Sequence, residues 1–400
     1  MDSWTNTHFN LLTNNGMKII TIIGARPQII KAAALSRAIQ QHYAGHIQEV
    51  IVHTGQHYDD NMSQVFINEL GIPQPDYNLH VGSASHGLQT ARMIEGIEQI
   101  LVDEKPNCIV LYGDTNSTLA GAVAASKIHV PVVHIEAGLR SFNKSMPEEI
   151  NRIVCDHCST LLFSPTRTGF DNLAREGFMM DNGGPYTIDN PKVYHCGDIM
   201  YDNSLYFSSI ADQKVDLLQR LGLENKPYVL TTLHRDSNTD HSERLNAILD
   251  AILTLSTDID VVLPMHPRTR KMVHLLVDPE KTNRLMQNKN IQIIEPVSFL
   301  EMIQLEKHAK MVMTDSGGVQ KESYFFKKPC VILRPETEWV EIVETGAAIL
   351  VDADNEKILN YSHRYLQQPP VDFPEIFGDG HAAEFMLQKM LDSFDIPLHS

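Results

Sequence analysis

Runs of apolar residues about as long as a β-strand recur along this chain, and amphipathic stretches of helix length separate them. KIITIIG (18–24) is one such run, and KAAALSRAIQQHY (31–43) follows it with helical spacing. Strands that are apolar throughout are typical of a parallel sheet with helices on both faces. The alternation therefore predicts a doubly wound α/β fold. The other strands predicted in this half are 49–55, 107–114, 130–138 and 160–165.

The alternation restarts after about residue 196, which predicts a second, Rossmann-like α/β domain. A chain of 400 residues also fits two domains better than one. We expect a flexible N-terminal extension over 1–16, an N-terminal Rossmann-like domain over 17–195 and a C-terminal one over 196–377. A terminal helical segment, 378–400, is expected to pack back on the first domain. The strands predicted in the second domain are 227–234, 259–267, 291–297, 309–315, 329–334 and 347–352.

Charge and cysteine content exclude several classes of protein. The net charge is −17, from 33 basic and 50 acidic residues, whereas a nucleic-acid binder carries a basic face. No apolar run approaches the roughly 18–20 residues that span a bilayer, so no membrane partner is expected. Five cysteines at low density favour a reducing, cytoplasmic setting over a disulfide scaffold.

Polar residues gather directly after the predicted strands. Ligands of doubly wound folds bind at the carboxyl ends of the strands, so two such domains predict a ligand site in an interdomain cleft. The clusters are GARPQ, GQH, GDTNST and HIEAGLR in the first half, and LHRDSN, HPRTR and TDSGGVQKE in the second.

Ser316, Gly317 and Gly318 form the sharpest candidate for a phosphate site. The two glycines follow a predicted strand and open a helix, where backbone N–H groups and the helix dipole favour an anion. The alternative is a plain helix cap by Asp315 or Ser316. Cations at other strand ends strengthen the interpretation of a diphosphate ligand. These cations are Arg26, Lys31, His234, Arg235, His266 and Arg268.

Several acids stand where a buried strand ends or a helix begins. Asp114 and Glu136 end two strands that we expect to be neighbours, so their carboxylates should converge and serve as acid and base. Asp114 could instead cap the following helix. Glu148 and Glu149 follow Pro147, where first-turn acids simply suit the helix dipole.

A stretch from Cys155 to Cys158, reading Cys-Asp-His-Cys, has the spacing of half a metal site. A second pair of cysteines with that spacing is absent from the sequence, so we interpret the stretch as helix packing and expect no metal.

Taken together in this order and spacing, the motifs resemble those of the non-hydrolysing UDP-N-acetylglucosamine 2-epimerase family. The resemblance covers residues 17 to 391. It implies a GT-B-type arrangement of the two domains, a homodimer, and a UDP-sugar substrate handled without NAD or any other cofactor. It also implies interconversion of UDP-GlcNAc and UDP-ManNAc by loss of UDP and its re-addition through a glycal. The motifs are GARPQIIK, HTGQH, YGDTNSTLAGA, HIEAGLR, MPEEINR, TLHR, HPRTR and TDSGGVQKESYFFKKPCVILRPETEW.

The resemblance also implies roles for individual residues. Asp114, Glu136 and Glu148 match the proposed acid/base carboxylates, and Glu149 is left as a first-turn acid. His234 matches a histidine beside the leaving diphosphate. The residues expected to bind UDP are Arg26, Lys31, His266, Arg268, Ser316, Gly317, Gly318 and Glu322. Those expected to contact or support the sugar are Gln56, His57 and Arg152.

Two departures from the family pattern bear on the substrate. Gln28 and Trp339 stand in GARPQ and TEWVE, where many UDP-GlcNAc members read GTRPE and TERPE. Both resemble the subgroup that acts on UDP-2,3-diacetamido-2,3-dideoxy-glucuronate, which is the alternative substrate. The sequence around Gln56 and His234 also lacks the family's activator-contact pattern, so allosteric activation is not expected. Rival functions are a GT-B glycosyltransferase, a UDP-sugar sensor without activity, and a hydrolysing epimerase.

Overall fold

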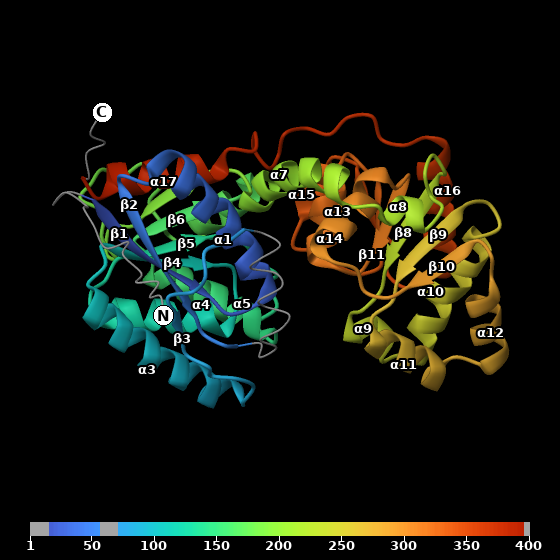
Figure 1. Ribbon diagram of the computed structural model, residues 1–400, viewed down its shortest axis with the longest axis horizontal. Helices are drawn as coiled ribbons and strands as arrows, with labels where there is room; N and C mark the ends of the chain where they lie inside the picture. Colours follow the sequence, from blue (N-terminus) through green and yellow to red (C-terminus); the bar gives the residue numbers. More distant parts are fainter. Residues whose placement is uncertain (1–15, 57–70, 396–400) are drawn as a thin grey trace, which may run out of the picture. The chain divides into compact units, whose positions relative to one another are not determined.

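The computed structural model describes residues 16–56 and 71–395, which divide into two compact units (Figure 1). The first unit takes in the described residues up to Asn203 and those from Phe377 onward, and the second unit is Ser204–Ile376. Apart from Gly16, the extension expected over residues 1–16 lies outside the described residues.

The first unit is built on a parallel sheet. Its described residues contribute seven strands in the order β3-β2-β1-β4-β5-β6-β7. The central strands are buried along nearly their whole length, as their unbroken apolar sequences predict. The strands are β1 (Met17–Ile23), β2 (Ile47–His53), β3 (Tyr77–Asn78), β4 (Cys108–Tyr112), β5 (Val132–Ile135), β6 (Leu161–Ser164) and β7 (Lys192–His195).

Helices cover this sheet, and local signals explain where two of them start. Thr115 caps α4 by accepting from the Thr118 N–H, and Thr166 caps α6 by accepting from the Gly169 N–H. The last helix, α17, packs on α1. The helices are α1 (Arg26–Ala38), η1 (Ile39–Tyr43), α3 (His86–Glu104), α4 (Asn116–Lys127), α5 (Pro147–Cys158), α6 (Arg167–Arg175) and α17 (Ala382–Ser393).

The second unit repeats the plan. Among its residues, six parallel strands pair in the order β10-β9-β8-β11-β12-β13. One helix, α7 (Ile199–Lys214), starts in the first unit and ends in the second. The strands are β8 (Tyr228–Thr232), β9 (Asp260–Pro264), β10 (Ile291–Ile294), β11 (Met311–Thr314), β12 (Cys330–Ile332) and β13 (Ala348–Leu350).

The core of the second unit lies between its sheet and the helices around it. On α10, Ile248, Leu249 and Ile252 are fully buried against β-strand residues such as Val261 and Met311. The helices are α8 (Leu217–Arg220), α9 (Asp236–Thr239), α10 (Ser242–Leu255), α11 (Pro267–Leu276), α12 (Pro279–Gln287), α13 (Phe299–His308), α14 (Gly317–Phe325), α15 (Val340–Glu344) and α16 (Asn355–Gln367).

The predicted doubly wound α/β fold is confirmed in both units. Each strand order reverses once, between β1 and β4 in the first sheet and between β8 and β11 in the second. Loops on either side of such a switch point diverge and leave room for a ligand at the carboxyl ends of the strands. Across the described ranges, no helix combines the length and apolarity needed to cross a bilayer.

Candidate active site

Four of the residues singled out in the sequence lie at or next to the switch point of the first sheet. Arg26 opens α1 directly after β1 and is exposed. Lys31 lies one turn further along the same helix. Asp114 follows β4, and Glu136 follows β5, which pairs with β4.

Glu136 is held in an unusual backbone conformation. Its φ of +73° places a non-glycine residue in the left-handed region, which is disfavoured for side chains with a Cβ atom. Its side chain is 7% exposed and forms an ion pair with Lys31. A Cβ atom added to Gly113 would lie 3.2 Å from Glu136 Oε2, so the bare backbone there makes room for this carboxylate. The Glu136 carboxylate therefore sits beside the residue that precedes Asp114.

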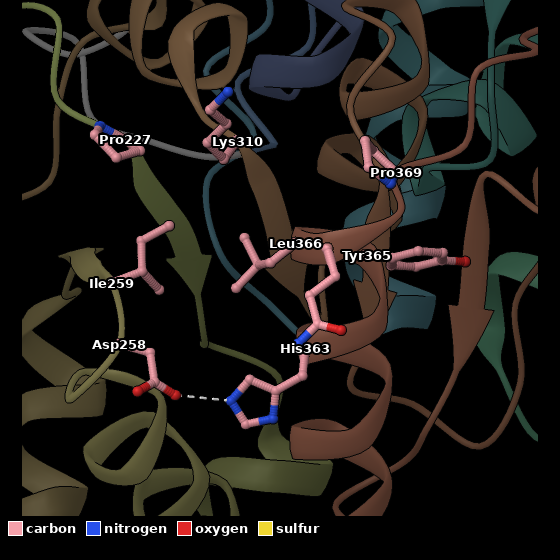
Figure 2. A pocket seen from close by; sticks show the side chains of 9 residues that line it. Pro227, Asp258, Ile259, Lys310, His363, Tyr365, Leu366 and Pro369 are labelled. Carbon is pink, nitrogen blue, oxygen red and sulfur yellow. Dashed lines mark hydrogen bonds and ion pairs between the residues drawn. The ribbon is translucent and has the colours of Figure 1, made fainter.

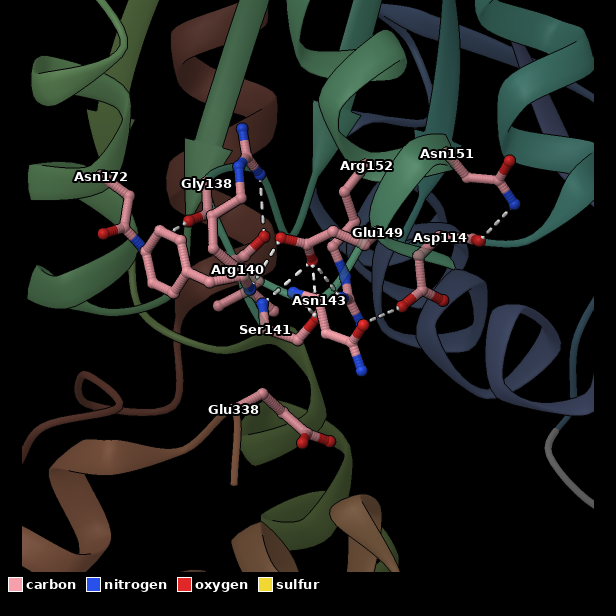
Figure 3. A network of polar contacts seen from close by, with 12 residues as sticks. Asp114, Gly138, Arg140, Ser141, Asn143, Glu149, Asn151, Arg152, Asn172 and Glu338 are labelled. Atoms are coloured by element: carbon pink, nitrogen blue, oxygen red, sulfur yellow. Dashed lines mark hydrogen bonds and ion pairs between the residues drawn. The ribbon is translucent and has the colours of Figure 1, made fainter. Parts of the chain in front are cut away.

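Asp114 is bound to an arginine from a neighbouring helix. Arg152 of α5 forms an ion pair with Asp114 through Nη2 and donates through Nη1 to Glu149 Oε2, 3.0 Å away. Figure 3 shows Arg152 reaching both acids. Asp114 does not cap α4, because Thr115 does so. The Asp114 side chain stays about a third exposed, at 32%, and can meet a ligand.

The two acids at the start of α5 differ sharply in environment. Glu148 is exposed, whereas Glu149 is only 1% exposed. Glu149 accepts hydrogen bonds from the backbone N–H groups of Ser141 and Phe142, both at 2.9 Å. Burial works against its charge, but these bonds and Arg152 outweigh that effect and hold the pKa of Glu149 below its ordinary value. The interpretation of Glu149 as a simple first-turn acid is wrong.

Nothing in the local sequence distinguishes these two glutamates, because both occupy the first turn after Pro147. The distinction comes from the loop at residues 141–142, which folds over Glu149 alone.

The other first-unit candidates are placed in part. Gln56 follows β2 and accepts from the Ser117 hydroxyl at 2.7 Å and the Ser117 N–H at 3.0 Å. This contact joins the loop after β2 to the start of α4. His57, expected near the sugar, lies outside the described residues.

In the second unit, a buried aspartate joins the two strand ends at the switch point. Asp315 follows β11 and accepts from the backbone N–H groups of His234 and Arg235, which follow β8, at 3.1 and 3.0 Å. The His234 imidazole is about half exposed, with Nδ1 3.5 Å from Asp315 Oδ1. Partial burial lowers the pKa of His234 against the opposing effect of Asp315, which favours a neutral ring at neutral pH.

The turn after Asp315 has the features of an anion site. Ser316 caps α14, its hydroxyl accepting from the Val319 N–H at 3.5 Å. Gly317 leaves room for the Glu338 side chain, because a Cβ atom there would lie 2.3 Å from Glu338 Oε1 and that carboxylate would have to shift. A Cβ atom at Gly318 would have only Ser316 Oγ and Glu322 Oε2 nearby, at 3.9 and 4.0 Å. The helix start can thus receive phosphate oxygens, and Glu322 can accept from hydroxyl groups of the same ligand.

His266 and Arg268 are engaged within the protein. His266 caps α11, and its Nδ1 accepts from the Arg268 N–H at 3.3 Å. The Arg268 guanidinium forms ion pairs with Asp236 at 2.8 Å and Asp240 at 2.7 Å. A diphosphate would therefore have to compete with two carboxylates for Arg268.

A cavity of about 350 Å³ lies at the opposite edge of the second sheet (Figure 2). Pro227, Ile259 and Lys310 line it, and each stands next to the first residue of a strand. His363 and Asp258, which also line it, are 2.9 Å apart. Since ligands of parallel sheets bind at the carboxyl ends, this cavity is not the site built by the motifs.

The first unit thus has acids at its strand ends, and the second has a helix start suited to an anion. Such sites at the carboxyl ends of doubly wound sheets are typical of enzymes that act on nucleotide-linked substrates. The sequence model of the UDP-N-acetylglucosamine 2-epimerase family matches residues 37–391, and the chain belongs to that family. It is an isomerase of the UDP-sugar 2-epimerase type.

Relatives of known activity or structure match over nearly the whole chain. The UDP-2,3-diacetamido-2,3-dideoxy-D-glucuronate 2-epimerase of Pseudomonas aeruginosa is 47% identical over 368 residues, 92% of this chain and 97% of that protein. The crystal structure of the Methanocaldococcus jannaschii UDP-GlcNAc 2-epimerase in complex with UDP-GlcNAc and UDP is 40% identical, with a TM-score of 0.81, covering 94% of this chain and 100% of that chain. The Neisseria meningitidis enzyme bound to UDP-GlcNAc is 28% identical, with a TM-score of 0.80 and coverage of 94% and 100%.

Proposed function

We propose that the chain inverts C2 of a UDP-2-acetamido sugar, with the carboxylates after β4 and β5 moving the C2 proton. The observation that carries this proposal is the placement of Glu136. Its carboxylate is buried, paired with Lys31 and held by a left-handed backbone beside the turn that bears Asp114. Strain of this kind is maintained at functional sites by the surrounding structure.

The second unit is proposed to hold the UDP group. The N–H groups of Gly317 and Gly318 at the start of α14 suit the phosphates, and the Glu322 carboxylate suits the ribose hydroxyls. The further residues proposed to contact UDP are Arg26, Lys31, His266 and Arg268. Those proposed to contact the sugar, or to support residues that do, are Gln56, His57 and Arg152.

The proposed reaction is an elimination followed by an addition. A carboxylate takes the proton from C2 while the bond between C1 and the UDP oxygen breaks, which leaves a glycal and free UDP. The UDP oxygen then attacks C1 again, and a proton is delivered to the other face of C2. A C2 proton beside an acetamido group is very weakly acidic, so the leaving diphosphate must be stabilised as its charge develops.

Each catalytic residue has a proposed part in these steps. Glu136 and Glu148 act as base and acid with Asp114, whose position Arg152 fixes. His234, a neutral imidazole beside the β8 strand end, donates a hydrogen bond to the leaving diphosphate.

Two substrates are compatible with this chemistry. The 47% identity to the Pseudomonas aeruginosa enzyme favours UDP-2,3-diacetamido-2,3-dideoxy-D-glucuronate over UDP-GlcNAc. The two departures from the family pattern, Gln28 and Trp339, favour the same substrate. Both side chains are buried. Gln28 donates to the Tyr112 carbonyl and the Thr118 hydroxyl, both at 3.1 Å. Trp339 makes a cation–π contact with Lys321, whose Nζ lies over the indole ring, 4.1 Å from the ring centroid.

Incubating the full chain with each UDP-sugar in deuterated water, followed by proton NMR, tests the proposal. We expect deuterium at C2 of both epimers of the diacetamido-glucuronate compound, with slower or no exchange in UDP-GlcNAc. Glu136→Gln should lower exchange by about 100-fold or more, the size of a general acid–base contribution, with UDP affinity unchanged. Glu95→Gln, an exposed position on α3, is the matched control. Epimerisation without deuterium uptake, or full activity of Glu136→Gln, would contradict the mechanism.

We also propose, on the basis of family membership, that the chain forms a homodimer and that it works in the cytoplasm. Sedimentation of the full chain checks the assembly, and a mass equal to one chain would rule the dimer out.

A further inference from the structure

We propose that His134 and Asp156 form a buried positioning pair that fixes the turn bearing Asp114 and the turn bearing Glu136 relative to each other. The inference rests on the proposed roles of those two acids and adds residues that touch neither the sugar nor the nucleotide. Asp156 belongs to the Cys-Asp-His-Cys stretch, which the proposed reaction leaves without a part.

His134 spans the gap between two strands from a fully buried position in β5. Its Nδ1 lies 2.6 Å from Asp156 Oδ1, and its Nε2 lies 2.8 Å from the Gly113 carbonyl oxygen. A carbonyl and a carboxylate only accept hydrogen bonds, so both ring nitrogens carry a proton and the ring is an imidazolium. Burial opposes this charge, but Cys155 and Asp156 beside the ring raise the pKa of His134 well above its usual value.

Asp156 completes the link with its second oxygen. Oδ2 accepts from the Gly138 N–H at 3.1 Å and from Arg140 Nη2 at 2.7 Å. Arg140 in turn donates to both oxygens of Glu176 at 2.7 Å. Two cations and two anions therefore alternate, so the buried charges are compensated.

These contacts bracket Glu136 in the chain. His134 stands two residues before it and Gly138 two residues after it, and Asp156 binds both. The left-handed conformation of Glu136 is disfavoured for a residue with a Cβ atom, so the surrounding structure has to hold it in place. The same imidazolium holds the Gly113 carbonyl, one residue before Asp114. One ring thus connects the backbone turns of both acids.

Two substitutions separate the halves of this link. In His134→Asn the side-chain amide takes the place of Nδ1 and keeps a donor toward Asp156, but the bond to Gly113 is lost. In His134→Gln the amide takes the place of Nε2 and keeps the Gly113 bond, but the Asp156 contact is lost. The control is His157→Asn, which alters a half-exposed imidazole next to Asp156 in sequence, 3.8 Å from Glu176.

We expect each His134 variant to fold and to lower kcat by about 100-fold, because a misplacement of about 1 Å has an effect of that size. The affinity for UDP should stay within threefold of the wild type, since His134 touches none of the proposed UDP contacts and the helix start proposed to bind the phosphates belongs to the other unit. His157→Asn should match the wild type. A wild-type kcat in both His134 variants, or a loss of UDP affinity as large as the loss of kcat, would overturn the inference.

Nitrogen-15 NMR of the wild-type chain labelled at histidine keeps the inference testable if the variants fail to fold. The His134 ring should show two protonated nitrogens at neutral pH, and a neutral tautomer would overturn it. Asp114→Asn and Glu136→Gln belong in the same assay. If they keep full turnover, the proposed function itself fails; if they lose turnover while the His134 variants keep it, only the positioning role fails.

Discussion

At the scale of single residues, the acids of the first unit are distinguished by their partners. Asp114 is joined to Arg152, and Glu136 is joined to Lys31. Glu149 is buried and contacts both Arg152 and the loop at residues 141–142. Arg152 therefore has a fixed position from which to hold Asp114, and Glu149 belongs to the framework of the site.

Replacing Glu149 by Gln should destabilise the protein at neutral pH by about 1–3 kcal/mol, because an amide cannot accept from all the donors around a buried carboxylate. The pKa of Glu149 is below its ordinary value, so its stabilisation is present above the unfolded-state pKa of about 4.3 and disappears as the pH falls through the lower folded-state pKa. Urea unfolding across this range measures the difference between variant and wild type.

The neighbouring acid is the matched control for this substitution. Glu148→Gln changes an exposed side chain in the same helical turn, so its effect on stability should stay within about 0.5 kcal/mol. Equal losses in the two variants would show that Glu149 gains nothing from its contacts with the loop.

At the scale of elements, Asp202 is one of the residues that tie the last helix to the rest of the first unit. Asp202 on α7 accepts from the backbone N–H groups of Ala382 and Ala383, at 3.1 and 2.8 Å, and so satisfies the start of α17. Burial nevertheless raises the pKa of Asp202 to about 7. The hydrogen bonds from the start of α17 therefore lower the pKa of Asp202, whereas burial raises it, and burial has the larger effect.

Ionisation of Asp202 should lower the stability of the protein as the pH rises, whereas ionisation of Glu149 raises it. A carboxyl whose pKa rises on folding from about 3.9 opposes folding once the pH exceeds that value, and the opposition grows until the pH passes about 7. Asp202→Asn lacks this ionisation, so its stability relative to wild type should increase between pH 5 and pH 8. Urea midpoints at the two pH values measure this change.

Asp379 offers the control, since it is exposed and accepts from the His381 N–H at 3.1 Å near the same helix. Asp379→Asn should show no such trend. Parallel pH curves for Asp202→Asn and the wild type would contradict the raised pKa.

At the scale of the whole molecule, two doubly wound units place different chemistry at their switch points. The first unit carries paired acids after β4 and β5, and the second carries the glycine-containing helix start after β11. A net charge of −17 makes general attraction of an anion unfavourable, so recognition of UDP must depend on local backbone donors and cations.

Hydrogen exchange of the full chain tests this division of roles. UDP should slow exchange at the Gly317 and Gly318 amides, because phosphate oxygens would accept from them. Uridine, which lacks the phosphates, should leave these amides unchanged. Equal protection by uridine and UDP would contradict a phosphate site at the start of α14.

Much of this organisation could be predicted from the sequence. Unbroken apolar runs such as KIITIIG (18–24) predict buried parallel strands, and parallel strands place their carboxyl ends at one edge. The positions of Asp114, Glu136 and Ser316 at strand ends follow directly. Strands β3 and β7 were missed, because their sequences, YN and KVYH, are not unbroken apolar runs of the kind used to recognise the other strands.

The sequence by itself determined which residues stand at the ligand edges, because hydrophobic periodicity and turn residues act over short distances along the chain. Only the tertiary structure decided that Glu149 rather than Glu148 is buried, that Glu136 takes a left-handed backbone, and that His134 joins Asp156. These features depend on contacts that packing makes between different elements, such as the loop at residues 141–142 with α5 and strand β5 with α5. The energy of a buried charge is set by the partners that packing brings to it, and no local pattern encodes them.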